Sequence, residues 1–150
     1  MVWDQLKFVR GATIKTLEKI DESKWDVQPP GFSNTIKWNA GHIYFVLESF
    51  MKMADSSYDT KVKEYNSYFA AGTRPSDWPG QSPSKQEVIQ LLNEQTENIQ
   101  RHFSDRLQAQ PQKEITIRGL TFSSVEELLN FTLFHEGLHL GIIQTQNKLI

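Results

Sequence analysis

Three of the four histidines stand in surroundings that suit a metal ion. His135 and His139 lie four residues apart in a stretch with helical periodicity, and residues at this spacing share one face of a helix about one turn apart. Their imidazoles can therefore converge on one ion. His42 precedes the apolar run 43–47, where a buried ring without a partner would cost free energy.

A metal ion would provide all three rings with a partner. Neutral imidazole is a good ligand for zinc, nickel, copper and iron. Three protein ligands leave one position of a tetrahedral ion open, which is the arrangement of catalytic rather than structural sites. We therefore predict a divalent metal site made of His42, His135 and His139, with zinc or nickel as the ion. Buried histidines that only form hydrogen bonds would fit the same pattern.

Residues 135–139 also match H-E-x-x-H, the signature of zinc metalloproteases, in which Glu136 would be the general base. None of the eleven residues after His139 is His, Asp or Glu, so the protease interpretation lacks its usual third ligand. We expect Glu136 on the solvated face of the helix, with support of the ligands as the alternative. Only one Glu-x-x-His element is present, which argues against a di-iron site. His102 is expected to be a solvated residue at a helix end.

Composition narrows the class of protein. A chain of 150 residues fits a single domain, 1–150. The absence of cysteine excludes disulfides and thiolate ligands, and the net charge of −2 gives no basic footprint for nucleic acid or anionic membranes. The chain has no apolar run long enough to span a bilayer, and its N-terminus does not resemble a secretory signal. We expect a cytoplasmic protein whose partner is a small molecule.

Helical periodicity marks four stretches that must position the histidines. Ser84 and Glu87 form a capping box at the start of the third stretch. The expected helices run from Val2 to Ile20, from Asn34 or Thr35 to beyond Phe50, from Ser84 to Phe103, and from Ser123 or Ser124 to about Asn147. The expected inner face of the last helix contains Leu128, Phe131, His135, Leu138, His139 and Ile142.

Two other segments complete the predicted fold. Residues 54–83 form a long second connection, rich in aromatic side chains, which we interpret as a rigid cover packed over one end of the bundle, with a functional lid or binding loop as the alternative. Residues 115–122 alternate around Gly119 and predict a short β-hairpin. The fold class is therefore all-α, a four-helix bundle of up-and-down or crossover topology. Trp38 and Phe45 flank His42 by about one turn each and could line a pocket beside the ion.

These motifs, in this order, resemble the DinB family of metal-binding four-helix bundles. The resemblance is carried by Trp38-Asn-Ala-Gly-His42, by the loop that ends in Trp78, and by His135-Glu-Gly-Leu-His139-Leu-Gly141. It implies a metal held by three histidines, which correspond here to His42, His135 and His139. A Gln that often follows the final Gly in the family is replaced here by two isoleucines before Gln144.

The resemblance also implies a function. Members of the family are often homodimers, and relatives in the wider superfamily include transferases that use low-molecular-weight thiols such as bacillithiol or mycothiol. The corresponding hypothesis is an enzyme that uses its ion to activate a thiol toward a small electrophilic substrate. Two alternatives remain open: a metal-dependent hydrolase, and a helical dimer that binds a metal or small ligand without catalysis.

Overall fold

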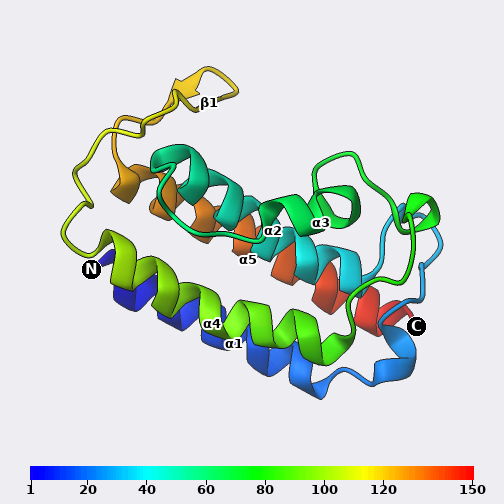
Figure 1. The fold of residues 1–150 in the computed structure, drawn as a ribbon. Helices are drawn as coiled ribbons and strands as arrows, with labels where there is room; N and C mark the ends of the chain where they lie inside the picture. The colour runs from blue at the N-terminus through cyan, green and yellow to red at the C-terminus, as the bar shows by residue number, and fades with distance from the viewer.

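Four long helices build the molecule, and the computed structural model describes all residues from 1 to 150 (Figure 1). A short fifth helix, α3, lies between α2 and α4, and an antiparallel hairpin of two short strands precedes α5. The predicted all-α fold with a hairpin before the last helix is confirmed. The elements are α1 Val2–Lys19, α2 Ile36–Ala54, α3 Val62–Phe69, α4 Lys85–Phe103, β1 Thr116–Ile117, β2 Leu120–Thr121 and α5 Val125–Leu149.

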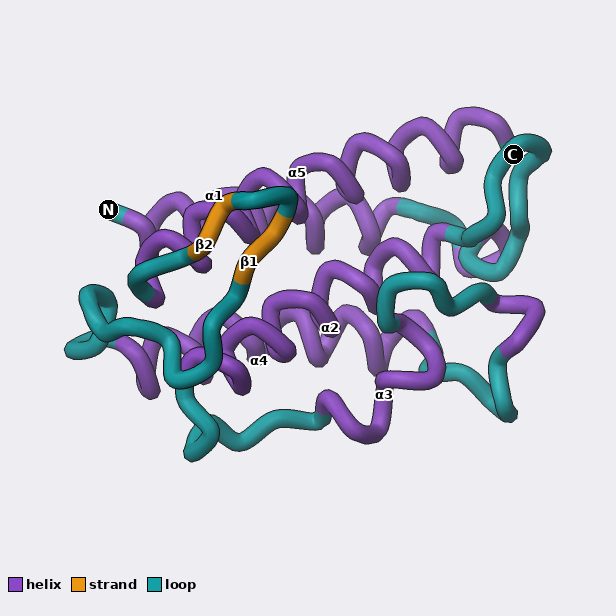
Figure 2. Tube along the Cα trace, turned by 90° about the horizontal axis from the view of Figure 1, so that it is seen from above, coloured by secondary structure: helices purple, strands orange, loops and turns teal.

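The four long helices form a crossover bundle. Helices α1 and α5 run in one direction and α2 and α4 in the other (Figure 1). Each packs against two others, in the order α1, α4, α2, α5 around the bundle. Because α2 and α4 are parallel, the chain between them must return along the length of the bundle. Figure 2 shows this long connection, with α3 in it, along the outside of the helices.

Side-chain caps begin three of the four long helices at the predicted residues. The Thr35 hydroxyl accepts a hydrogen bond from the Trp38 amide at the start of α2. Ser84 and Glu87 form the predicted capping box of α4, and Ser124 caps α5. Such caps satisfy backbone N–H groups that have no partner within the helix.

Helix α3 was not predicted from the sequence. It has eight residues, of which only Phe69 is buried, and a 3₁₀ turn at Pro75–Asp77 follows it in the same connection. A helix this short is unstable by itself and offers too few turns for a periodic signal. Its packing against α2 stabilises it instead, so the connection is an ordered cover.

The bundle core is apolar at both ends and polar in the middle. One apolar cluster includes Leu6 and Leu129, and the other includes Leu17 and Ile143. Between them lie buried polar side chains from all four long helices, which we call the polar layer. Its members are Arg10, Thr13, Glu48, Gln95, Thr132 and Glu136.

The predicted inner face of α5 was partly wrong. Leu138 is 52% exposed, whereas Glu136 and Gln146 are buried. Apolar periodicity misplaced this face because Glu136 and Gln146 have hydrogen-bond partners in the core, whereas Leu138 lies at the surface. None of the helices combines the length and the apolar character required to span a membrane.

Candidate metal centre

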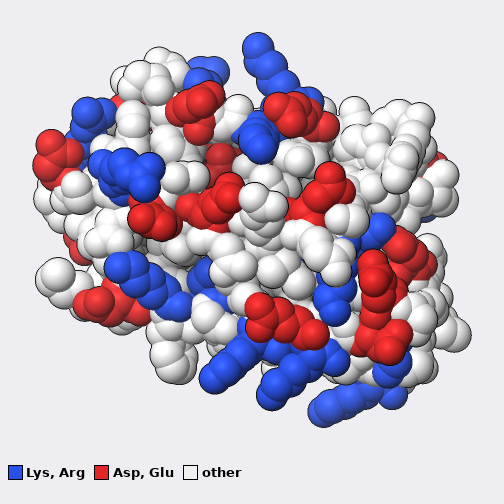
Figure 3. Space-filling model, turned by 60° about the horizontal axis from the view of Figure 1, so that its bottom comes forward, with Lys and Arg blue, Asp and Glu red and all other residues white.

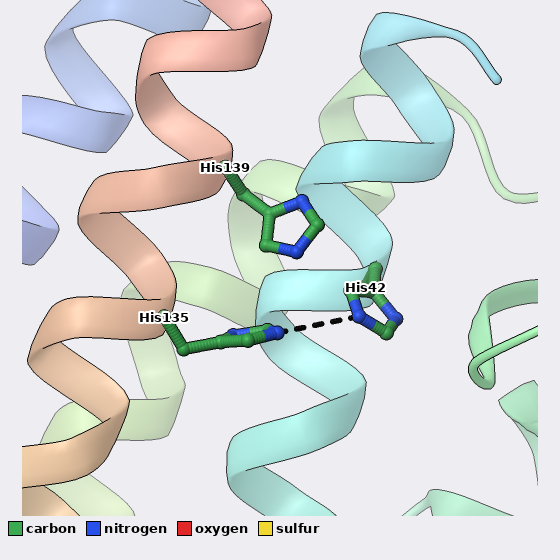
Figure 4. Close-up of side chains that lie close together, drawn as sticks. All are labelled: His42, His135 and His139. Carbon is green, nitrogen blue, oxygen red and sulfur yellow. Dashed lines mark hydrogen bonds between the residues drawn. The ribbon is translucent and has the colours of Figure 1, made fainter.

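Helices α2 and α5 pack together and bring the three histidines to one point (Figure 4). The Nε2 atoms of His42 and His135 are 3.3 Å apart, and one ring nitrogen from each histidine lies within 4.8 Å of the others. Two nitrogens bound at about 2.0–2.1 Å to a tetrahedral zinc ion stand about 3.3 Å apart. The shorter separation fits shared coordination, and the longer one requires a small approach of the third ring.

The His42 ring is held by the last residue of α3. Its Nδ1 lies 2.7 Å from the Phe69 carbonyl oxygen, which can only accept, so Nδ1 carries the proton and Nε2 keeps a lone pair that faces His135 Nε2. The Phe69 ring lies directly on Gly41, where an added Cβ would stand 2.3 Å from a ring carbon. Only glycine at position 41 leaves room for the residue that orients His42.

The His139 ring is oriented by a buried asparagine. Its Nδ1 lies 2.8 Å from Asn39 Oδ1. Asn39 Nδ2 donates to the Thr35 carbonyl oxygen at 2.9 Å, which fixes the amide orientation and makes Oδ1 the acceptor. His139 Nδ1 therefore carries the proton and Nε2 is free for a metal. Hydrogen bonds of this kind fix the tautomer and direction of metal-binding histidines.

An indole covers one side of the site. The Trp38 ring stacks on the His42 ring, with centroids 4.5 Å apart and planes 14° apart. Trp38 Nε1 donates to the Thr73 hydroxyl, which ties this ring to the long connection. Phe45 is buried in the apolar cluster that includes Leu17 and Ile143, and no ring contact joins it to the histidines. The pocket role of Trp38 and Phe45 stays a prediction.

Burial keeps the three imidazoles neutral at physiological pH. Burial, together with the smaller effect of the neighbouring histidines, lowers the pKa of His139 to about 3 and that of His135 to about 4. Burial also lowers the pKa of His42, partly opposed by the hydrogen bond to Phe69. A metal-binding histidine must be unprotonated, so these rings are in the required state without paying for deprotonation near pH 7.

Glu136 is not on the solvated face of α5, as the sequence suggested, but in the polar layer. Arg10 Nε and Nη2 donate to its two carboxylate oxygens at 2.9 and 3.0 Å, and the Thr13 hydroxyl donates to Oε1 at 2.7 Å. Arg10 Nη1 also donates to the Leu92 carbonyl, so the group links α1, α4 and α5. This carboxylate is engaged away from the histidines and cannot act as a base beside them.

His102 lies outside the centre and is not the solvated residue that we expected. Its Nε2 is 3.0 Å from Asp55 Oδ2, and its side chain is 24% exposed. The ring also packs against Tyr58 and Phe103. It anchors the start of the long connection to the end of α4.

Sequence reasoning missed the groups that orient the ligands. Asn39 carried a usable signal, because a buried amide three residues before a histidine in an apolar helix needs a partner. The Phe69 contribution is a backbone carbonyl, and no sequence pattern marks one. The link from Arg10 to Glu136 spans 126 residues, and nothing local in either helix indicates it.

Comparison with known families adds to this geometry. A family model described as the DinB superfamily matches residues 5–143, which include all three histidines and almost the whole bundle. No curated protein matches the chain.

Proposed function

Because the chain belongs to the DinB superfamily, we propose that it binds a divalent metal ion and transfers a small thiol to an electrophilic substrate. His42, His135 and His139 would hold the ion, with zinc or nickel as the first candidates. The observation that carries this proposal is the convergence of three neutral imidazoles, two of which are protonated on Nδ1 and keep the lone pair of Nε2.

The residues around the centre would hold the ion, orient the histidine rings and exclude water from one side of the site. A bound divalent ion would supply one property, a lowered pKa of a thiol that it coordinates. The Phe69 carbonyl and Asn39 hold two of the rings in place before a ligand arrives. Trp38, stacked on His42, shields one side from solvent. Pre-orientation of this kind reduces the reorganisation needed for catalysis.

The overall reaction would be a nucleophilic substitution. The thiol sulfur forms a bond to an electrophilic carbon, the leaving group departs with the electron pair of the broken bond, and the thiol proton is released to solvent. Such a reaction requires no oxidant and no reductant. A cytoplasmic location, where small thiols remain reduced, would suit it.

Hydrolysis at the same centre is a weaker candidate. It would need a base beside the ion to take a proton from the attacking water, and the motif assigns that role to Glu136. Both oxygens of Glu136 are bound to Arg10 instead. Binding of a metal or small ligand without catalysis remains the second alternative.

The test is an assay of the metal-loaded protein with small thiols and chlorodinitrobenzene as the electrophile. We expect metal-dependent consumption of thiol that the His139→Ala variant loses and the His102→Ala variant retains. Bound metal without any metal-dependent turnover would contradict transfer and favour the binding protein. Turnover of ester substrates without thiol would favour the hydrolase.

We also propose that the protein is a homodimer in solution. Phe8 on α1 and Phe134 and Leu138 on α5 are between 52% and 79% exposed, on two helices that pack side by side. Figure 3 shows basic and acidic side chains interspersed over the visible face, with several basic ones along its lower edge. Light scattering of the wild type and of a Phe134→Glu variant tests the dimer, which the variant should dissociate.

A further inference from the structure

A second buried carboxylate in the polar layer has no cationic partner. Glu48 is 3% exposed. Its Oε1 accepts hydrogen bonds from the Tyr58 hydroxyl at 3.1 Å and from Gln95 Nε2 at 2.9 Å, and both donors are neutral. The only buried guanidinium of the layer, that of Arg10, makes its hydrogen bonds to Glu136 and to the Leu92 carbonyl. A buried ionised carboxylate without a counter-charge is costly.

The free oxygen of this carboxylate faces a cavity. Oε2 makes no hydrogen bond within the protein, and it remains in contact with solvent. Glu48 lines a cavity of about 150 Å³ together with Tyr44, Tyr58 and Gln95. Oε2 is therefore accessible from this cavity. The Tyr44 hydroxyl also has no partner in the protein and remains accessible there.

This cavity is separate from the metal centre. At about 100° per residue, Tyr44 and Glu48 lie about 200° and 240° around α2 from His42. They face α4, since Gln95 on α4 donates to both the Tyr44 carbonyl and the Glu48 carboxylate. His42 faces α5. A ligand in the cavity would not touch the three imidazoles.

The charge of the lining favours a cation. The lining contains three carboxylates, of Glu48, Asp59 and Glu94, and one ammonium group, of Lys61. Asp59 and Glu94 are exposed, so they lie where a ligand would enter, while Glu48 lies deep. An excess of one sign of charge in a cleft raises the local concentration of the opposite ion.

We propose that this cavity binds a small primary ammonium ion, with N–H groups that donate to Glu48 Oε2 and to the Tyr44 hydroxyl. An ammonium group has three donors and no acceptor, which matches these free acceptors. A hard metal cation binds oxygen ligands only and would make no use of the apolar part of the lining. The rings of Tyr44 and Tyr58 and the side chain of Leu91 would instead contact a short alkyl group.

Size and electrostatics support an alkylammonium of a few carbons. An apolar cavity of about 150 Å³ accommodates a benzene molecule, so a two-carbon to four-carbon chain fits this one. Burial raises the pKa of Glu48, opposed by the hydrogen bonds from Gln95 and Tyr58 and, more weakly, by the charge of Arg10, which forms no ion pair with it. A cation against Oε2 would favour the ionised carboxylate.

The experiment is a titration of the intact, metal-loaded protein with ethylammonium chloride, followed by backbone amide chemical shifts. We expect saturable shifts at residues 44–48, 58–61 and 95. Tetramethylammonium, which has the same charge but no N–H donor, should cause none at equal ionic strength. Absence of saturable shifts with ethylammonium, or equal shifts with both ions, would overturn the proposal.

Matched variants locate the ion. Glu48→Gln keeps the shape and the acceptor for Tyr58, and it should weaken ethylammonium binding roughly tenfold to a hundredfold, since a hydrogen bond to a charged group has that effect. Tyr44→Phe, which preserves ring packing, should weaken it less. Glu114→Gln, an exposed site outside the cavity, should not change it. Unchanged affinity in folded Glu48→Gln protein would refute the assignment.

Discussion

Replacement of Glu136 by glutamine distinguishes a structural carboxylate from a catalytic base. The substitution keeps the shape of the side chain but removes the charge that Arg10 faces, and both side chains are 3% exposed. Removal of one partner of a buried ion pair costs about 3–5 kcal/mol, because the other charge remains buried. A domain of this size is stable by about 5–15 kcal/mol in total. We therefore expect a variant that still folds but has a much smaller free energy of unfolding.

The magnitude can be read from thermal unfolding. For a protein of this length, 1 kcal/mol corresponds to about 2–4 °C in Tm, so the expected decrease is roughly 6–20 °C. Circular dichroism at the helical minimum follows the transition. Glu97→Gln, an exposed position on α4, is the control and should change the free energy of unfolding by less than about 0.5 kcal/mol.

A double variant completes the test. Substitution of both partners with apolar residues, Arg10→Met with Glu136→Leu, removes both buried charges and should recover much of the lost stability. A role of Glu136 as a catalytic base predicts the opposite result. If Glu136→Gln abolished turnover while the unfolding curve stayed unchanged, Glu136 would be a catalytic base and the structural account would be refuted.

Two further predictions concern the ordered cover and its anchor. Gly41→Ala should lower the free energy of unfolding by about 1–3 kcal/mol and weaken metal affinity, since its Cβ would collide with the Phe69 ring; Gly137→Ala, with open space around it, should be neutral or stabilising in the same urea titration. Hydrogen bonds from the Ser57 hydroxyl and amide, followed by His102, hold the pKa of Asp55 well below its usual value. The stability that Asp55 contributes is therefore present above about pH 4, the unfolded pKa, and lost as pH falls below it. Asp55→Asn should reduce stability at neutral pH and flatten this acid dependence; an identical pH profile would contradict the assignment.

Local signals were sufficient to predict the four long helices of this bundle. The Ser84 and Glu87 capping box and the hydroxyl caps at Thr35 and Ser124 act within one turn of chain, so the sequence reveals them. The short helix Val62–Phe69 depends on packing against α2, and a local pattern cannot show that. The alternation of residues 115–122 around Gly119 likewise predicted the hairpin. In the structure Gly119 has a φ of 85°, a conformation that favours glycine.

The candidate ligands could be found from the sequence, but the groups behind them could not. Spacing on one helix paired His135 with His139, and burial in an apolar helix singled out His42. The position of Glu136 was misjudged because its partner, Arg10, lies on a helix 126 residues away. A charged side chain can be buried when a counter-charge that is distant in sequence lies next to it in the fold. Its location therefore depends on tertiary structure rather than on local periodicity.

The most direct test of the central claim is the metal content of the purified protein. Elemental analysis should find about one transition-metal ion per chain in the wild type after loading with zinc or nickel and removal of excess, as a single site of three histidines requires. His42→Ala and His139→Ala should lose it, and His102→Ala, which alters a histidine outside the centre, should retain it. A wild type that binds no ion, or alanine variants that bind as much as the wild type, would contradict the account.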